Sequence, residues 1–240
     1  MDLDEIVEVV AKGIPAVDHF TQLIRVNAGT QESLLPGVKT LTEKQFVADL
    51  VKWWSEDEQA QLFDIYNFET ERKYSHTKRA KCDLVLSSDG SGLDFPEWAI
   101  EFKHISLAGN NGKANGYAVQ KVLSPYLNDR SLIHDIERLK YDPPGKKLAV
   151  IGYCFDYSFA SCDEALRLHP NHPDVIENLR KLCKSVDPRN GIFSAADLVE
   201  FADEIFQKRG LVSTPVIRKF SNAWKHPAGG NGLVFGWQVL

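Results

Sequence analysis

The chain has 240 residues, of which 43% are hydrophobic, and its formal net charge is −5. This content is enough for a substantial core, and because no low-complexity linker interrupts the sequence we expect one domain over residues 1–240. The surplus of acidic residues excludes a protein that coats DNA everywhere. With no run of roughly 20 apolar residues and an acidic rather than basic start, the sequence predicts a cytoplasmic protein without a membrane span.

The first element that the sequence predicts clearly is a helix over residues 41–55, "LTEKQFVADLVKWWS". Its apolar residues recur at helical spacing and would form one buried face. A threonine followed three positions later by Glu or Gln makes a capping box, and two pairs fit this rule: Thr40 with Glu43, and Thr42 with Gln45. A helix therefore begins here, and either pair is a candidate for its cap.

A hairpin follows a plausible first strand within residues 61–74. Residues 82–103, "CDLVLSSDGSGLDFPEWAIEFK", contain two alternating runs around a turn rich in Ser, Asp and Gly, which predicts two antiparallel strands that each have one apolar side. The apolar side comprises Cys82, Leu84, Leu86, Trp98, Ile100 and Phe102. The other side comprises Asp83, Val85, Ser87, Ala99, Glu101 and Lys103.

The remaining predicted elements follow in order. A helix occupies part of residues 117–140, with "RSLIHDIERLK" its clearest portion, and "KKLAVIGYCF" (146–155) is a strand buried on both faces. Two amphipathic helices come next, "NHPDVIENLRKLCK" and "SAADLVEFADEIFQKRG", the second with Ser194 as N-cap and Gly210 just past its end. The last segment, 222–240, predicts a hairpin around Pro-Ala-Gly-Gly-Asn-Gly.

The hairpin of residues 82–103 raises a question about charge. If it is symmetric its midpoint is Gly92, and Asp83 then lies opposite Glu101 on one face, with Lys103 beside them. Directly opposed carboxylates are destabilising unless something lies between them. A hard divalent cation such as Mg²⁺ takes one or two protein carboxylates together with water and phosphate oxygens, so this face predicts a metal site. The alternative is a surface salt bridge between Glu101 and Lys103 on an exposed sheet face.

These residues resemble the PD-(D/E)XK nuclease superfamily, which includes many type II restriction endonucleases. The motif reads Cys82-Asp83 followed by Glu101-Phe102-Lys103, with Cys82 where the family usually has proline. Glu71-Arg72-Lys73 also spells Glu-x-Lys, but the second copy follows a hairpin in an apolar strand. The predicted order of helix, three strands, helix and strand is that of the family's αβββαβ core, and the resemblance covers about residues 41–157.

The resemblance implies an α/β fold with a restriction-endonuclease-like mixed β-sheet flanked by helices. Helical and β-hairpin additions follow the core, so that residues 158–240 are a C-terminal extension of unassigned role. It implies that Asp83 and Glu101 hold Mg²⁺, for which Mn²⁺ substitutes, with the backbone carbonyl of Phe102 as a further ligand. Lys103 would orient an attacking water or help to deprotonate it. Glu43 is a candidate for an additional acid from the first helix, although its capping-box role is an alternative.

The expected substrate is double-stranded DNA. Basic residues precede Asp83 and would place a phosphate backbone beside the metal, whereas a solvated loop is the alternative. Two residues of the following helix are further candidates for phosphate contact, although a plain surface role fits them equally. The nucleic-acid candidates are Arg72, Lys73, Lys78, Arg79, Lys81, Gln120 and Lys121.

The resulting prediction is a Mg²⁺-dependent DNA endonuclease of restriction-modification or related prokaryotic defence type. Symmetric double-strand cleavage implies a homodimer. A structure-specific or repair nuclease and a non-catalytic nucleic-acid-binding protein on the same scaffold are the alternatives. The four cysteines show no Cys-x-x-Cys spacing and are expected to be reduced and buried. His104 and the two C-terminal tryptophans, Trp224 and Trp237, are expected to pack in the core; base or subunit contact is the alternative for the tryptophans.

Overall fold

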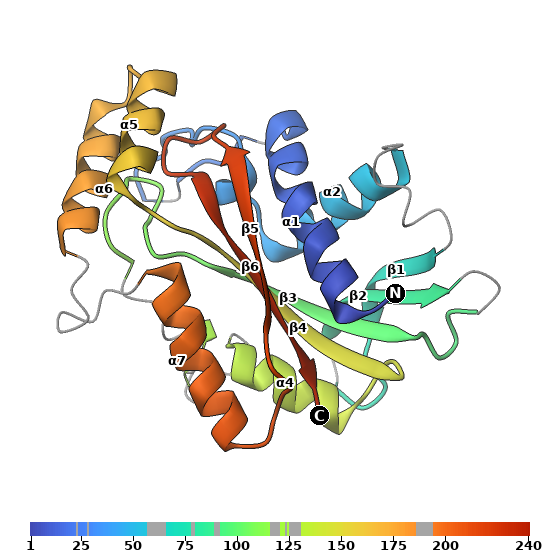
Figure 1. The fold of residues 1–240 in the computed structure, drawn as a ribbon. Helices are drawn as coiled ribbons and strands as arrows, with labels where there is room; N and C mark the ends of the chain where they lie inside the picture. The colour runs from blue at the N-terminus through green and yellow to red at the C-terminus, as the bar shows by residue number, and fades with distance from the viewer. Residues whose placement is uncertain are drawn as a thin grey trace.

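The protein is built around one six-stranded mixed β-sheet. The computed structural model describes residues 1–22, 24–27, 29–56, 66–77, 80–88, 92–115, 121–122, 124, 131–185 and 194–240. The strands are β1 (Tyr66–Lys73), β2 (Lys81–Ser88), β3 (Trp98–Ile105), β4 (Lys147–Phe155), β5 (Val216–Ala223) and β6 (Gly230–Val239). Their order across the sheet is β1-β2-β3-β4-β6-β5, and only the β3–β4 pair is parallel among them (Figure 1).

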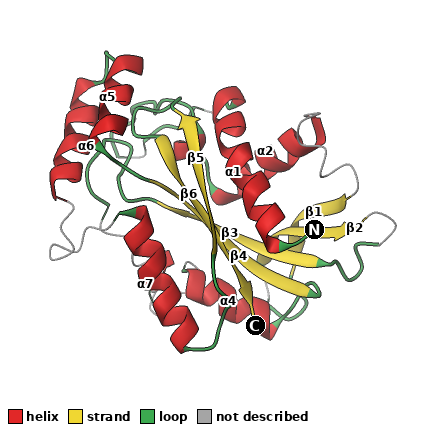
Figure 2. Ribbon diagram, in the orientation of Figure 1, coloured by secondary structure: helices red, strands yellow, loops and turns green. Residues whose placement is uncertain are grey.

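Six α-helices lie within the described residues, together with one short 3-10 helix, η1 (Val38–Thr40). The α-helices are α1 (Leu3–Phe20), α2 (Glu43–Glu56), α4 (Leu132–Tyr141), α5 (Phe159–Leu168), α6 (Pro173–Ser185) and α7 (Ala195–Lys208). Figure 2 shows α1 and α2 on one face of the sheet, α4 and α7 on the other, and the α5–α6 pair at one end. None of the helices in these described ranges is long and apolar enough to span a membrane.

Each face of the sheet carries its own apolar core. The core beneath α1 and α2 includes Ile14, Phe46, Phe102 and Tyr153, whereas the one beneath α4 and α7 includes Val85, Leu132, Phe206 and Trp237. Every residue of β3 is buried as a result. The alternative of an exposed sheet face at Glu101 and Lys103 is therefore wrong. Both sides are covered, so polar residues of β3 lie inside the protein.

Helix ends follow the local chemistry of the sequence. The backbone N–H of Gln45 donates to Thr42 Oγ1 at 3.2 Å, and the N–H of Thr42 donates to Gln45 Oε1 at 3.1 Å, so this pair forms the capping box of α2. Glu43 does not cap the helix, and its carboxylate is available for other contacts. Ser194 caps α7 as predicted, and Gly210, with φ +62°, follows its end.

Most predicted elements are present near their expected bounds. The helix over 41–55, the hairpin within 82–103, the strand over 146–155, the two later helices and the final hairpin are all confirmed. The first strand begins at Tyr66, and residues 61–65 of its predicted range lie outside the described residues. Helices α1 and α5 were not predicted. The final hairpin also joins the main sheet, because β6 pairs with β4 from Gly232 to Val239.

Gly152 offers a test of how tightly the sheet packs beneath α4 and α7. A Cβ atom at this position of β4 would lie 2.1 Å from Cε2 of the buried Phe235 ring. We expect Gly152→Ala to lower the free energy of unfolding by about 1–3 kcal/mol, because the added methyl group overpacks the core. Urea denaturation measures this change.

Gly92→Ala is the matched control for the added methyl group. A Cβ atom there would approach only the Asp94 backbone nitrogen, at 4.0 Å. The control variant should unfold within about 0.5 kcal/mol of the wild type. Equal stability of the two variants would contradict the packing at Gly152.

Candidate active site

The register of the β2–β3 pair places Asp83 beside Glu101. Leu84 pairs with Ile100, and Leu86 pairs with Trp98. The same register, continued by one residue, brings Asp83 level with Glu101. Asp83 Oδ2 accepts a hydrogen bond from the backbone N–H of Phe102 at 2.8 Å. The register expected from a midpoint at Gly92 is therefore confirmed, and a side chain of β2 takes up a main-chain donor of β3.

The neighbouring strand β1 is irregular at the same position. The β1–β2 register passes from Thr70 with Leu84 to Arg72 with Cys82 without pairing Glu71 and Asp83. Glu71 has φ +60°, a left-handed conformation that non-glycine residues rarely adopt. Salt bridges from Lys44 at 2.8 Å and Lys81 at 3.2 Å hold its carboxylate. Such strained backbone within a strand is enriched at functional sites, and here it lies in the edge strand beside Asp83.

Glu101 is 3% exposed, and its carboxylate is held by two side chains. Oε1 accepts from the hydroxyl of Tyr74, just after β1, at 2.5 Å. The same oxygen accepts from Arg138 of α4, at 3.1 Å from Nη2 and 3.3 Å from Nε. Tyr74 and Arg138 thus fix this carboxyl group from two separate elements.

Lys103, two residues further along β3, is 6% exposed and lies among carboxylates. Its Nζ is 2.9 Å from Asp135 Oδ2 on α4 and 3.4 Å from Glu43 Oε2 on α2. Asp135 also contacts Arg138 on the same helix. The alternative of an exposed surface pair between Glu101 and Lys103 is wrong, since both side chains are buried and each pairs with other residues.

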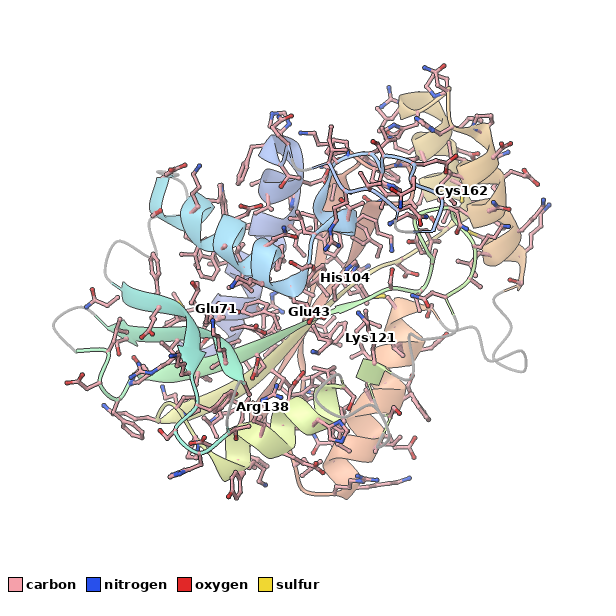
Figure 3. The ribbon with its side chains drawn as sticks, turned by 180° about the vertical axis from the view of Figure 1, so that it is seen from behind. Glu43, Glu71, His104, Lys121, Arg138 and Cys162 are labelled. Atoms are coloured by element: carbon pink, nitrogen blue, oxygen red, sulfur yellow. The ribbon has the colours of Figure 1, made fainter. Side chains whose placement is uncertain are left out.

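Glu43 joins this cluster from the first turn of α2 and lies near Lys121 (Figure 3). Its Oε1 accepts the backbone N–H of His104 at 3.2 Å and lies 3.9 Å from Lys121 Nζ. The side chains of Glu43 and Lys121 are 30% and 40% exposed, so the cluster meets solvent on their side. The capping-box interpretation of Glu43 is therefore wrong, because Gln45 performs that role.

Burial and neighbouring charge raise the pKa values of both acids and of the lysine, which favours the neutral form of the acids and the charged form of the lysine. Burial raises the pKa of Asp83 to about 6, although the hydrogen bond from Phe102 opposes the shift. Burial also raises the pKa of Glu101 well above its usual value, and the charges of Asp83 and Asp135 add to the rise. Burial alone would lower the pKa of Lys103, but Asp135 and Glu43 outweigh it and raise that pKa, so the ammonium group stays charged.

The chain's own cations offset part of the repulsion between the acids. Four carboxyl groups, those of Glu43, Asp83, Glu101 and Asp135, lie among the cations of Lys103, Lys121 and Arg138. Across the described ranges, no group of three or more His, Cys, Asp or Glu side chains is arranged to hold a metal by itself.

The donor set nevertheless fits a hard divalent cation. Asp83 and Glu101 interact directly through their carboxyl groups, and burial and mutual repulsion both disfavour their full ionisation in the absence of a cation. Mg²⁺ commonly takes one or two protein carboxylates and completes its shell with water and phosphate oxygens. The backbone carbonyl of Phe102, between Glu101 and Lys103, is the further ligand that the sequence resemblance implies.

The residues expected to contact nucleic acid lie in different surroundings. Arg72 donates to the backbone carbonyls of Leu93 and Asp94, and Lys81 pairs with Glu71, so these two cations bind their own chain. Lys73 is exposed, and Lys121 lies at the solvent side of the cluster. Lys78, Arg79 and Gln120 lie outside the described residues.

His104, Trp224 and Trp237, for which the sequence predicts packing rather than catalysis, all contact apolar residues or aromatic rings. The ring of His104 stacks on Tyr153 at 4.7 Å between centroids, and burial lowers its pKa well below the usual value, as its packing role predicts. Trp237 is fully buried, and its indole nitrogen donates to Asp203 at 2.8 Å. Trp224 is partly buried and packs against the small apolar cluster at α5 and α6.

The sequence analysis missed Tyr74, Asp135 and Arg138. Asp135 had a readable signal, because it lies three residues after Leu132 and four before Leu139, inside the apolar stripe of α4. An acid in such a stripe is buried and therefore needs a cationic partner. Tyr74 carries no comparable signal, since it follows a charged stretch whose path depends on the sheet.

Comparisons with protein-family models, with curated proteins and with solved structures give no significant match for this chain. The interpretation of the site therefore depends on its own geometry.

A separate cavity of about 440 Å³, lined by residues such as Tyr157, Lys219 and Asn231, includes none of the clustered residues.

The electrostatics of Asp83 can be tested without assaying activity. Its raised pKa favours the protonated form in the folded state, so the associated stability is present below pH 3.8 and is lost as pH rises through about 6. Asp83→Asn keeps an acceptor for the Phe102 N–H but cannot ionise. In EDTA, its free energy of unfolding relative to wild type should rise by about 2 kcal/mol between pH 4 and pH 7.

Asp94→Asn controls for the removal of one negative charge, because Asp94 is exposed. Its stability difference from wild type should stay nearly constant with pH. Parallel pH profiles for Asp83→Asn and wild type would contradict the burial of an ionisable group at Asp83.

Proposed function

We propose that this protein is a Mg²⁺-dependent DNA endonuclease with a restriction-endonuclease-like core of the PD-(D/E)XK type. The order α2-β1-β2-β3-α4-β4, with β3 and β4 parallel, supports the proposed αβββαβ core over residues 41–157. One observation carries the functional part. The hydrogen bond from the Phe102 N–H holds the carboxyl group of Asp83 beside Glu101, where the charge of the Lys103 ammonium group acts on it.

Asp83, Glu101 and the Phe102 carbonyl would hold the ion. The chemistry that a bound Mg²⁺ supplies is polarisation of the phosphoryl group and acidification of water. The residues of the chain then position the substrate around it. Glu43, at the solvent side and within reach of Lys103, is the candidate additional acid.

Lys103 acts in this proposal as a fixed cation. Of the two roles expected for it, orientation and deprotonation of water, the raised pKa supports orientation, because a lysine held charged by Asp135 and Glu43 is a poor proton acceptor. Its ammonium group would offset negative charge that develops on the phosphoryl oxygens. Asp135 keeps this ammonium group in place from α4.

Double-stranded DNA is the proposed substrate. Lys73 is exposed, and Lys81 and Lys121 are each 40% exposed although each pairs with a carboxylate of the chain, so these three described cations of the expected set are the candidates for phosphate contact. Symmetric cleavage of both strands requires two active sites, so the proposal includes a homodimer. A restriction or related defence role fits an acidic protein, because such an enzyme binds at selected sequences rather than everywhere.

Incubation with plasmid DNA, with and without Mg²⁺, tests the proposed activity. We expect cleavage that depends on the cation, with discrete fragments for a site-specific enzyme. Asp83→Ala and Lys103→Ala should each lower the rate by about 100-fold or more, because each removes a group that acts on the reacting phosphate or its metal. Gel analysis of the cleavage products measures these rates.

Asp94→Ala and Lys147→Ala are the matched controls, since both lie outside the carboxylate cluster. Lys147 is on the neighbouring strand and pairs with Glu97 at 3.0 Å. Both controls should cleave at the wild-type rate. A smear in place of discrete fragments would indicate a structure-specific or repair nuclease, whereas no cleavage with Mg²⁺ or Mn²⁺ would contradict the proposal and favour a non-catalytic binding protein.

A further inference from the structure

Two cysteines from neighbouring helices meet at the end of the molecule where α5 and α6 pack together. Cys162 lies in the first half of α5, where Figure 3 labels it, and Cys183 lies near the end of α6. Their Sγ atoms are 3.6 Å apart, although the residues are 21 positions apart in the chain. A disulfide bond needs about 2.05 Å between sulfurs, so closure requires a movement of about 1.5 Å.

The packing of the two helices holds the thiols at this separation. Asp163 and Arg180, which flank the pair, form an ion pair across the same interface. Apolar residues of both helices fill the space alongside, and this small cluster includes Ala165, Ile176, Leu179 and Leu182. The contact between the sulfurs thus follows from the register of a packed helix pair.

The two thiols have different surroundings. Cys183 is partly exposed, whereas Cys162 is 1% exposed. The hydrogen bond between them lowers the pKa of Cys183 and raises the pKa of Cys162. Cys183 is therefore the more exposed of the two sulfurs and the one whose pKa is lowered, with Cys162 behind it. The other two cysteines, Cys82 and Cys154, are fully buried, and burial raises the pKa of each.

We propose that Cys183 and Cys162 are a redox-active dithiol that hydrogen peroxide converts into an intramolecular disulfide. The Cys183 thiolate attacks one peroxide oxygen, so that an S–O bond forms, the O–O bond breaks and one water leaves after protonation. The Cys162 sulfur then attacks the Cys183 sulfur, so that the S–S bond forms, the S–O bond breaks and a second water leaves with the Cys162 proton. Two thiols lose two electrons, and one peroxide becomes two waters.

The disulfide would lock a helix pair that supports the chain beyond β3. The side chain of Asn178 on α6 donates to the backbone carbonyl of Asn111 at 3.1 Å. Gly112 lies against the Val175 carbonyl so closely that a Cβ atom there would be 2.2 Å away. Asn111 and Gly112, which lie beyond the end of β3, therefore contact α6. This inference goes beyond the proposed nuclease activity and does not depend on it.

Treatment of the full-length protein with hydrogen peroxide tests the dithiol. We expect a mass loss of two hydrogens, a Cys162–Cys183 cross-link in the peptide map, reversal by dithiothreitol, and a rise in Tm of about 5 °C in the oxidised form. In Cys162→Ser, the sulfenic acid should persist on Cys183 and react with dimedone. In Cys183→Ser, the mass loss should disappear.

Cys154→Ala is the control and should form the cross-link like the wild type. Addition of oxygen to the wild-type chain without this cross-link would overturn the proposal. A cross-link through Cys82 or Cys154, or between two chains, would also overturn it.

Discussion

The arrangement of the candidate site depends on one hydrogen bond, from the backbone N–H of Phe102 to the carboxylate of Asp83. This bond replaces a main-chain contact between β2 and β3 with a side-chain contact, and it brings an acid to the edge of β3 at Glu101. The strand on the other side, β1, adapts through the left-handed backbone of Glu71. A regular three-stranded ladder would turn Asp83 toward one face of the sheet, whereas this irregular one holds its carboxylate between strands.

Three elements that are remote in sequence supply the side chains that surround the buried groups of β3. Arg138 and Asp135 come from α4, Tyr74 from the end of β1, and Glu43 from the start of α2. Partnered charges inside a protein are tolerated, whereas a single unpaired one is strongly destabilising. Together these partners keep Lys103 charged and leave Asp83 and Glu101 with raised pKa values, which is the electrostatic state expected of acids that await a cation.

Local sequence patterns predicted the strands and their register but not the partners of the site. The two alternating runs are symmetric about Gly92, so the pairing of Asp83 with Glu101 could be derived from the sequence. Alternation of apolar residues predicted one apolar side for each strand, but sequence alone does not reveal that α4 and α7 cover the other side. Arg138 lies on α4, 37 positions after Glu101 in the chain, and no local rule fixes a contact over that separation. Helix α1 was readable, since Asp2 and Glu5 form its capping box.

The central claim is that Asp83 and Glu101 share one divalent cation. The most direct measurement is anomalous diffraction from crystals of the wild-type protein soaked in Mn²⁺, collected beside crystals of Asp83→Asn. We predict an anomalous peak in the wild type within coordination distance of both carboxylates and of the Phe102 carbonyl, and its loss in the variant. A wild-type map without a peak between the two acids, or with manganese bound only elsewhere, would contradict the account.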